Sequence, residues 1–315
     1  MRLGHARKVR WVSAMVFTVS LVLSGLALAQ AAYKYRDSSG HWVFTDRAPP
    51  DGVARDAFAV AAKEAKLNIE VTRLDEAEAT KLVAINGCLC DVSVEVAILE
   101  SQIPSLGAGA TLRDTLTPQS QKVLMLAPGA NKSKALTFTW KAALGSPYAI
   151  HHPPGPYRVP FGVGSSYLVS QAYPERITHA TADSAHAVDF ALPDGTPVYA
   201  AREGVVINAR HDAFQGGADP VLLDRANVVE ILHDDGSIAV YAHLHWDSIR
   251  VRIGQHVKRG EYLANSGNTG FSSGPHLHFA VVVNSGFEDV SVPVLFAGSG
   301  GDTVEPLTHT KVTAY

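Results

Sequence analysis

Cysteine is scarce in this chain of 315 residues, which contains only Cys88 and Cys90. A chain of this length can bury a hydrophobic core in each of two or three domains, so its fold does not depend on a disulfide framework. The cysteines lie in the segment NGCLCDV, and Cα atoms two residues apart along a strand are near the upper limit of disulfide geometry. No third or fourth ligand lies beside them to complete a metal site. We predict a structural role for both and leave their redox state open.

A strong excess of charge is also missing. The formal net charge is -3, 18% of the residues are charged, and Lys and Arg form no block beyond the N-terminus. Surfaces that bind nucleic acid are strongly basic. The composition therefore argues against nucleic acid and other polyanions as partners.

The N-terminus is typical of an export signal. Basic residues precede an apolar run over residues 12–28, and the small residues Ala27 and Ala29 offer a cleavage site. We predict that residues 1–29 are a signal peptide and that the mature protein is periplasmic or secreted, with no stable membrane span. An uncleaved anchor is the alternative, because the apolar run is near the lower length limit for spanning a membrane.

Residues 30–60 predict a small hairpin domain followed by a linker. Tyr33 and Tyr35, and then Trp42 and Phe44, alternate with polar residues on either side of a turn at residues 37–40. This stretch resembles a small hairpin domain of unknown function that follows the signal peptide of many exported Gram-negative proteins. The resemblance implies a compartment and no chemistry.

Residues 61–148 predict a β-sandwich accessory domain. Hydrophobic residues alternate with polar ones over residues 92–98 and 136–141, and turn-forming residues separate these segments. Alanine-rich segments at residues 61–66 and 74–82 predict short helices between the strands.

Residues 149–315 are again rich in predicted strands, such as GTPVYAAREGVVINAR and VVEILHDDGSIAVYAHL. A segment rich in Pro and Gly separates them from the sandwich. The predicted fold class is therefore all-β: an N-terminal hairpin, a small β-sandwich and a C-terminal antiparallel β-sheet domain.

The segment SSGPHLHF places His276 and His278 two residues apart, directly before an apolar run. Residues two apart on a strand point the same way, so both imidazoles reach one cavity. If one ring binds a metal, the other can hydrogen-bond the group at the open coordination position, which suits hydrolysis.

Three segments in order, AVDFALPDGTPVYAAREGVV, ANVVEILHDDGSIAVYAHL and IGQHVKRGEYLANSGNTGFSSGPHLHF, strongly resemble the lysostaphin-like (LytM-type) zinc metallopeptidases that cut bacterial peptidoglycan. The resemblance implies one zinc ion per chain, with Asp189 and His278 as ligands. It implies that His243 and His276 are the catalytic residues. Two imidazoles and a carboxylate leave a tetrahedral zinc open for water, as catalytic zinc sites do.

The first histidine ligand departs from the usual family pattern, because Ala185 stands four residues before Asp189. His186 is three residues before Asp189 and would face away from it on an extended strand. His179 resembles the ligand of a family branch with a short insertion before the aspartate. We predict His179 as the ligand, and His186 stays the alternative.

We therefore predict a zinc endopeptidase that hydrolyses the peptide cross-links of peptidoglycan. The predicted partners of the protein are the peptide stems of peptidoglycan. The alternative is a catalytically silent or masked LytM-type domain that activates cell-wall amidases. A protein regulator is a further expected partner, since the segment between Arg210 and Asn227 is long enough to rim the cleft as a flap.

Overall fold

The computed structural model describes residues 30–36, 42–45, 55–60, 68–103, 107–128, 135–175, 177–223 and 225–315, and in the first three ranges only the backbone. The predicted signal peptide lies outside these residues. The described residues form strands, with two short 3-10 turns, η1 (Pro220–Leu222) and η2 (Ser299–Gly301), and no α-helix. None of the helical segments in this part of the chain is long and apolar enough to span a membrane. The predicted all-β class is confirmed.

The N-terminal unit is a three-stranded antiparallel sheet. It contains β1 (Gln30–Arg36), β2 (Trp42–Thr45) and β3 (Arg55–Val60) in the order β2-β1-β3. β1 and β2 pair as the predicted hairpin, and β3, which the sequence did not predict, pairs with the other edge of β1.

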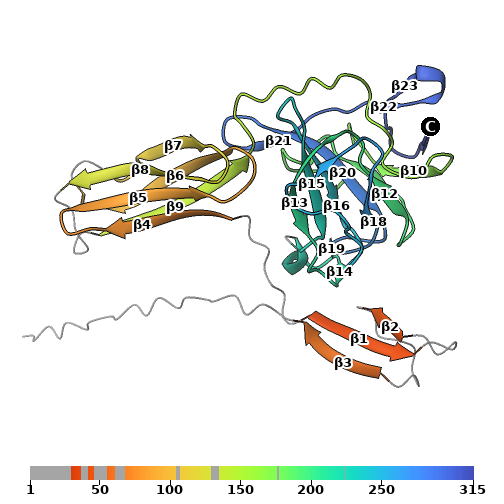
Figure 1. The fold of residues 1–315 in the computed structure, drawn as a ribbon, viewed down its shortest axis with the longest axis horizontal. Coiled ribbons are helices and arrows are strands. Elements are labelled where there is room, and N and C mark those ends of the chain that lie inside the picture. Colours follow the sequence, from red (N-terminus) through yellow and green to blue (C-terminus); the bar gives the residue numbers. More distant parts are fainter. Residues whose placement is uncertain are drawn as a thin grey trace, which may run out of the picture.

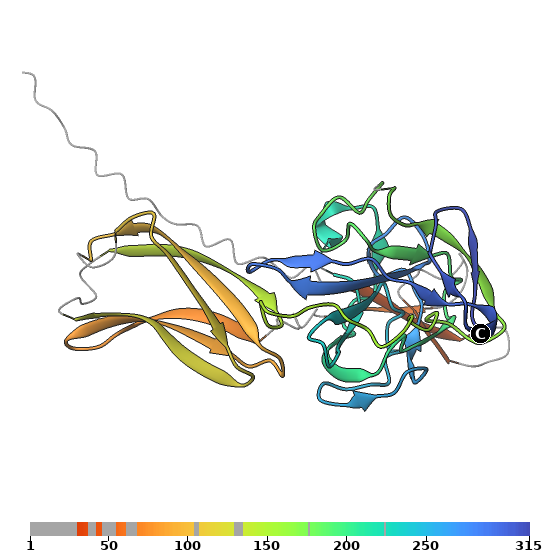
Figure 2. The same ribbon diagram turned by 90° about the horizontal axis from the view of Figure 1, so that it is seen from above.

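Two three-stranded antiparallel sheets form the β-sandwich, whose strands run side by side in Figures 1 and 2. One sheet contains β4 (Ile69–Asp75), β5 (Ala79–Asn86) and β8 (Ser120–Pro128). The other contains β6 (Val92–Ser101), β7 (Thr111–Leu116) and β9 (Leu136–Leu144).

The helix expected over residues 74–82 is wrong, because these residues lie in β4, β5 and the turn between them. β5 has a hydrogen-bonded neighbour on both sides, and Thr80, Leu82 and Ala84 are each fully buried. This burial with a period of two residues outweighs the helix propensity of alanine. The helix expected over residues 61–66 lies outside the described residues.

Both cysteines are buried as free thiols and belong to the core of the sandwich. Burial raises the pKa of the Cys90 thiol to about 12. A thiol that stays protonated is a poor nucleophile and metal ligand. The buried position agrees with a structural role.

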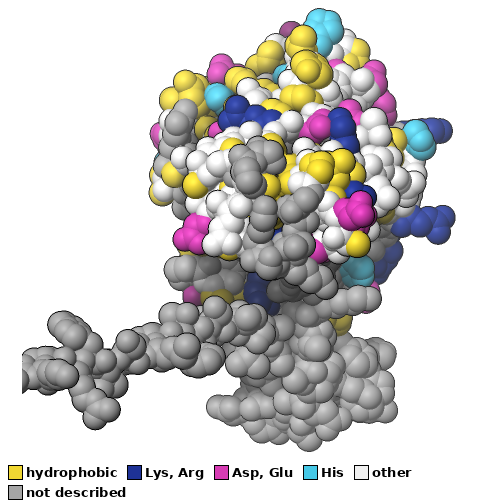
Figure 3. Space-filling model, turned by 90° about the vertical axis from the view of Figure 1, so that its left-hand side faces the viewer, with side chains coloured by type: hydrophobic (Ala, Val, Ile, Leu, Met, Phe, Trp, Pro, Cys, Tyr) yellow, Lys and Arg dark blue, Asp and Glu magenta, His cyan; other side chains and the backbone are white. Residues whose placement is uncertain are grey.

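The outer surface of the sandwich carries several half-exposed apolar side chains. Figure 3 views the molecule from this end, where hydrophobic side chains lie among Lys, Arg, Asp and Glu. The half-exposed apolar side chains of these strands are Leu74, Leu99, Val123, Leu126 and Trp140.

The C-terminal domain is built on a nine-stranded antiparallel sheet in the order β17-β13-β15-β16-β20-β11-β10-β24, with β21 paired to the end of β20. Figure 1 labels β13, β15, β16 and β20, which lie next to one another in this sheet. Its strands are β10 (Ser166–Gln171), β11 (Val188–Phe190), β13 (Gly204–Arg210), β15 (Val228–Leu232), β16 (Ile238–Ala242), β17 (His256–Val257), β20 (Leu277–Asn284), β21 (Asp289–Ser291) and β24 (Lys311–Thr313). Three two-stranded sheets flank it: β12 (Pro197–Tyr199) with β18 (Tyr262–Asn265), β14 (Gly216–Gly217) with β19 (Gly270–Phe271), and β22 (Phe296–Ala297) with β23 (Thr303–Val304).

β20 divides its side chains between two environments. Leu277, Phe279 and Val281 are fully buried in the main core of the domain. His278, Ala280 and Val282 alternate with them and therefore lie on the other face of the sheet. This second face carries the polar groups described below.

The far end of the second face packs against the sandwich. Ile207, Ile238 and Val282 of the large sheet belong to the hydrophobic core of the sandwich. Asn284 is buried, and its Nδ2 donates hydrogen bonds to Ser93 Oγ and to the carbonyl of Gly145, each at 2.8 Å. The two domains therefore share a core and a buried polar contact.

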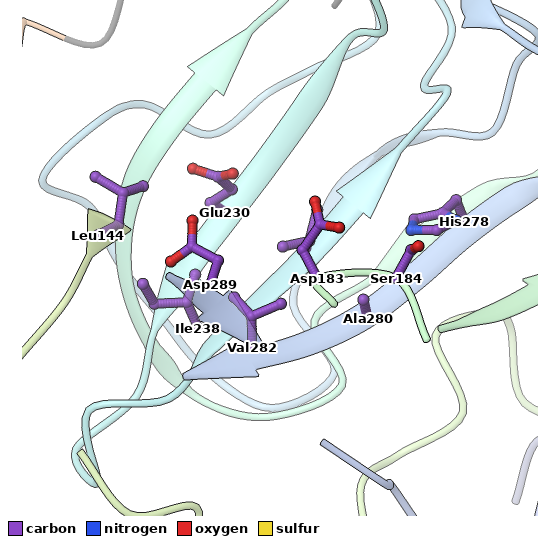
Figure 4. Close-up of a pocket in the computed structure, with 10 residues that line it drawn as sticks. Leu144, Asp183, Ser184, Glu230, Ile238, His278, Ala280, Val282 and Asp289 are labelled. Carbon is purple, nitrogen blue, oxygen red and sulfur yellow. The ribbon is translucent and has the colours of Figure 1, made fainter. Parts of the chain in front are cut away.

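A pocket of about 130 Å³ runs along this face from His278 to Leu144, the last residue of β9. Figure 4 shows His278 at one end and Glu230, Asp289 and Leu144 at the other. The remaining lining residues are Asp183, Ser184, Ile238, Val240, Ala280 and Val282. Asp289 Oδ1 is buried and has no hydrogen-bond partner among the described residues.

Asp289 makes the stability of this region depend on pH. Burial, followed by the charges of Glu230 and Asp183, raises the pKa of its carboxyl from 3.8 to about 7, and a hydrogen bond from the backbone of Leu144 offsets only part of this. The folded protein holds this proton more tightly than the unfolded chain does. The contribution of the Asp289 carboxyl to the free energy of unfolding is therefore fully present below about pH 4, and it is lost as the pH rises through about 7.

Asp289→Asn should remove this pH dependence, because the amide has a similar shape and no charge. The midpoint of thermal unfolding of the variant, measured relative to the original chain, should rise steadily between pH 4 and pH 8. Asp302→Asn, at an exposed position, is the control and should give a constant difference. An Asp289→Asn difference that is equally constant would contradict the assignment.

Candidate active site

Two neighbouring strands place Asp189 and His278 together. β11 pairs antiparallel with β20, and in this register Asp189 lies directly opposite His278. The Asp189 Oδ1 and His278 Nδ1 atoms are 3.0 Å apart. Directly opposite residues in a sheet project to the same face, so the pairing of backbones fixes the distance between these side chains.

His179 reaches the same point from the segment that joins β10 to β11. Gln171, the partner of Asp189 on β10, holds this segment through hydrogen bonds between its side-chain amide and Thr178. His179 is only 3% exposed, and its ring lies 5.0 Å from that of His278. The sequence-predicted residues His179, Asp189 and His278 are thus brought together, with one donor atom from each within 4.8 Å of the others.

The three side chains fit a metal ion. His179 Nε2 lies 3.1 Å from Asp189 Oδ2, yet neither ring nitrogen of His179 makes a well-aligned hydrogen bond with a described residue. A buried polar atom without a partner carries a desolvation cost of about 1–3 kcal/mol. A metal ion between the three donors would take one of these ring nitrogens as a ligand. Two imidazoles with one carboxylate are a ligand set of catalytic zinc sites.

Asp189 is in the ionised form that a ligand requires. Its burial alone would raise the pKa of the carboxyl, but the imidazoles of His179 and His278 outweigh this effect and hold the pKa well below its usual value. A carboxylate in a nearly closed site is therefore charged at neutral pH.

The alternative first ligand, His186, points elsewhere. Its Nδ1 lies 2.9 Å from the carbonyl of Ser291, and its backbone N–H donates to Ser291 Oγ. Its ring packs against Tyr173 at a centroid distance of 4.7 Å. These contacts hold His186 against β21 and outside the group formed by His179, Asp189 and His278.

His243 and His276 lie beside the candidate metal ligands. Their ring centroids are 4.5 Å apart, and the ring of His243 is 5.9 Å from that of His278. His276 Nε2 is 3.8 Å from Asp189 Oδ1. All five residues predicted for the site therefore meet at one place on the second face of the sheet.

Both of these histidines present the same nitrogen to the site. The Nδ1 atom of His243 lies 2.7 Å from the carbonyl of Thr269, and that of His276 lies 2.8 Å from the carbonyl of Gly274. A carbonyl oxygen only accepts hydrogen bonds, so in the neutral ring Nδ1 carries the proton and Nε2 is left as an acceptor. Burial, followed by the neighbouring His276 and His278, lowers the pKa of His243 to about 3 and keeps this ring neutral.

Residues of the turn between β18 and β20 support the site, and sequence reasoning missed their role. The hydroxyl of Thr269 is hydrogen-bonded to backbone groups near His243, and Ser272 Oγ lies 3.2 Å from His276 Nδ1. In the sequence both residues stand among Gly, Asn and Ser, which indicate only a turn.

The segment between Arg210 and Asn227, expected to rim the cleft, is docked onto this turn. β14 pairs in parallel with β19, and Gly270 approaches Ala226 so closely that a Cβ added to this glycine would lie 2.7 Å from the Ala226 backbone. Gly270 also has a φ of 80°, which side chains disfavour. A glycine at this position is therefore required both by the turn and by the contact.

The comparisons with known families bear on two parts of the chain. Residues 183–290 match the model of peptidase family M23, and residues 19–67 match that of a domain of unknown function, DUF4124. The first match contains Asp189, His243, His276 and His278.

Two curated relatives show the range of similar proteins. The peptidoglycan DD-endopeptidase ShyA of Vibrio cholerae is 35% identical over 126 residues, which are 39% of this chain and 26% of that protein. Lysostaphin of Staphylococcus simulans is 32% identical over 131 residues, which are 40% of this chain and 24% of that protein. The chain thus spans about a quarter of the length of these relatives.

A solved structure gives a match of similar extent. The catalytic domain of lysostaphin from Staphylococcus simulans is 31% identical, and the match covers 38% of this chain and 81% of that chain with a TM-score of 0.28. The chain thus contains one region that matches peptidase family M23, at residues 183–290, and one that matches DUF4124, at residues 19–67.

Proposed function

We propose that the chain is a zinc-dependent endopeptidase that hydrolyses peptide cross-links of bacterial peptidoglycan. The observation that carries this proposal is the convergence of His179, Asp189 and His278 beside two further histidines, each with its Nδ1 within hydrogen-bond distance of a backbone carbonyl. One zinc ion per chain would be held by the first three residues. When bound, zinc supplies a water of lowered pKa and polarises the amide carbonyl.

His243 and His276 do the proton transfer in this proposal. Each ring is oriented by a backbone carbonyl, from Thr269 and Gly274 respectively, so that Nε2 faces the reacting atoms. A neutral imidazole accepts the proton that the attacking water loses, and the resulting cation gives it to the departing amine. Once Nε2 has taken up a proton, it can also donate a hydrogen bond to the carbonyl oxygen as negative charge develops there.

The pocket that leads from His278 along β20 offers room for the peptide beside the scissile bond. Ala280 and Val282 line it with small or apolar side chains, and Asp183 and Ser184 contribute polar groups near His278. Ligand sites commonly combine an apolar lining with a few polar groups that fix orientation.

The proposed compartment and domain plan support a substrate in the cell wall. We assign residues 1–29 to a signal peptide, 30–60 to the hairpin domain and linker, 61–148 to the sandwich, and 149–315 to the peptidase domain. Export would bring the enzyme to the periplasm or outside the cell, where peptidoglycan lies. Similarity to a DD-endopeptidase and the DUF4124 segment favour the D-alanyl-diaminopimelate bond over a glycine bridge.

Metal content tests the ligand set. After dialysis against Zn²⁺ and removal of the excess, the original chain should retain one zinc ion per molecule by elemental mass spectrometry. His179→Ala and Asp189→Ala should each lose this zinc, because either change leaves only two of the three donors. The matched control is His186→Ala, which should still hold one ion. Zinc lost from His186→Ala and kept by His179→Ala would reverse the ligand assignment.

Mass spectrometry of digested cell walls tests the reaction. The zinc-loaded mature protein should convert cross-linked muropeptide dimers to monomers, and the mass of the products identifies the bond cut. His278→Ala and chelator-treated protein should release nothing, and added Zn²⁺ should restore only the chelated sample. If the zinc-loaded original chain releases no muropeptide monomers, the alternative of a silent amidase activator is favoured. If His278→Ala releases them, the proposed site is wrong.

A further inference from the structure

His243 has an unusual backbone conformation at the end of a strand. β16 ends at Ala242, and His243 has a φ of 61°, in the left-handed region. Non-glycine residues adopt this region rarely and keep it where the surrounding structure holds them. The ring is then fixed by the hydrogen bond from Nδ1 to the carbonyl of Thr269.

The hydroxyl of Thr269 joins the residue whose carbonyl binds His243 to the backbone of two other segments, at Leu244 and at Asn227. Thr269 is 4% exposed, and its Oγ1 donates to the carbonyl of Leu244 at 2.8 Å and accepts from the backbone N–H of Asn227 at 3.0 Å. Leu244 directly follows His243. A single buried hydroxyl therefore ties the turn that carries the accepting carbonyl to the chain that carries the histidine.

Asn227 completes the connection. It is fully buried, and its Nδ2 donates to the carbonyls of Leu244 and Ala213 at 3.1 and 2.9 Å. Its Oδ1 accepts from the backbone N–H of Ala213 at 2.8 Å. Every polar atom of this side chain is thus used to hold the backbone around His243 and the segment that precedes β14.

We infer that Thr269 and Asn227 are positioning residues that set the tautomer of His243. A neutral imidazole carries one proton, and a carbonyl held at Nδ1 keeps the proton there. If the carbonyl of Thr269 were free to move, the tautomer with the proton on Nε2 would become populated, and that nitrogen could no longer accept a proton from the substrate water. The inference rests on the proposed function for its catalytic meaning, whereas the tautomer itself is a property of the folded chain.

The test compares Thr269→Val, which removes the hydroxyl with little change in shape, with Thr269→Ser, which keeps it. The matched control is Thr308→Val, since Thr308 Oγ1 also makes two backbone hydrogen bonds, both to Ala172. The tautomer of His243 is measured from the ¹⁵N shifts of its ring in the zinc-loaded protein. kcat, KM and zinc content are measured in parallel.

Thr269→Val should populate the second tautomer and lower kcat by about 10–100-fold, by analogy with the loss of a hydrogen-bond partner of a metal-ligating histidine. KM and zinc content should stay unchanged, and Thr269→Ser should restore the original tautomer and rate. Thr308→Val should lower only the unfolding midpoint. If Thr269→Val does not fold, Thr269→Ala provides the same comparison.

An unchanged tautomer in a folded Thr269→Val protein would overturn the inference, even if kcat falls, because the residue would then be merely structural. If the original chain cuts no wall material, the proposed function fails, but the ¹⁵N comparison needs no turnover. The two failures are therefore distinguishable.

Discussion

The site depends on the antiparallel pairing of β11 with β20, which sets Asp189 opposite His278. On β20 the same alternation sends Leu277 and Phe279 into the main core, where both are fully buried. A slip of one residue would exchange the two faces, exposing the apolar side chains and burying the histidine. Burial of these apolar side chains therefore stabilises one register of β11 and β20. This register brings the two candidate ligands, Asp189 and His278, within 3.0 Å of each other. His179, His243 and His276 form a site only together with this fixed pair.

Around this pair, the protein uses backbone groups to orient rings. Thr269 and Gly274 offer carbonyls to His243 and His276, and the carbonyl of Ser291 holds His186 outside the site. Carbonyls cannot donate, so each one fixes which ring nitrogen carries the proton. The rings are thus oriented by the protein itself. Among the described residues, neither ring nitrogen of His179 has a hydrogen-bond partner, and a metal ion would take one of them as a ligand.

Much of the fold class and the site could be predicted from the sequence, because both leave local patterns. Alternating apolar residues predicted strands, and the spacing of His276 and His278 predicted two rings at one place. His186 is an instructive case: a strand through residues 186–189 would turn it away from Asp189, but β11 begins only at Val188, and it is Ser291 that holds the ring elsewhere. Long-range pairing leaves no such pattern. Contacts between distant segments determine the order of the nine strands and the core shared with the sandwich. They also determine the strand in place of a helix at residues 79–82 and the role of Thr269.

The most direct test of the account is a crystal of the zinc-loaded chain, with anomalous diffraction recorded on both sides of the zinc absorption edge. We expect one strong anomalous peak per chain, bonded to His179, Asp189 and His278 at about 2.0–2.2 Å, with His243 and His276 nearby but not bonded. A peak bonded to His186, or one that excludes Asp189, would contradict it.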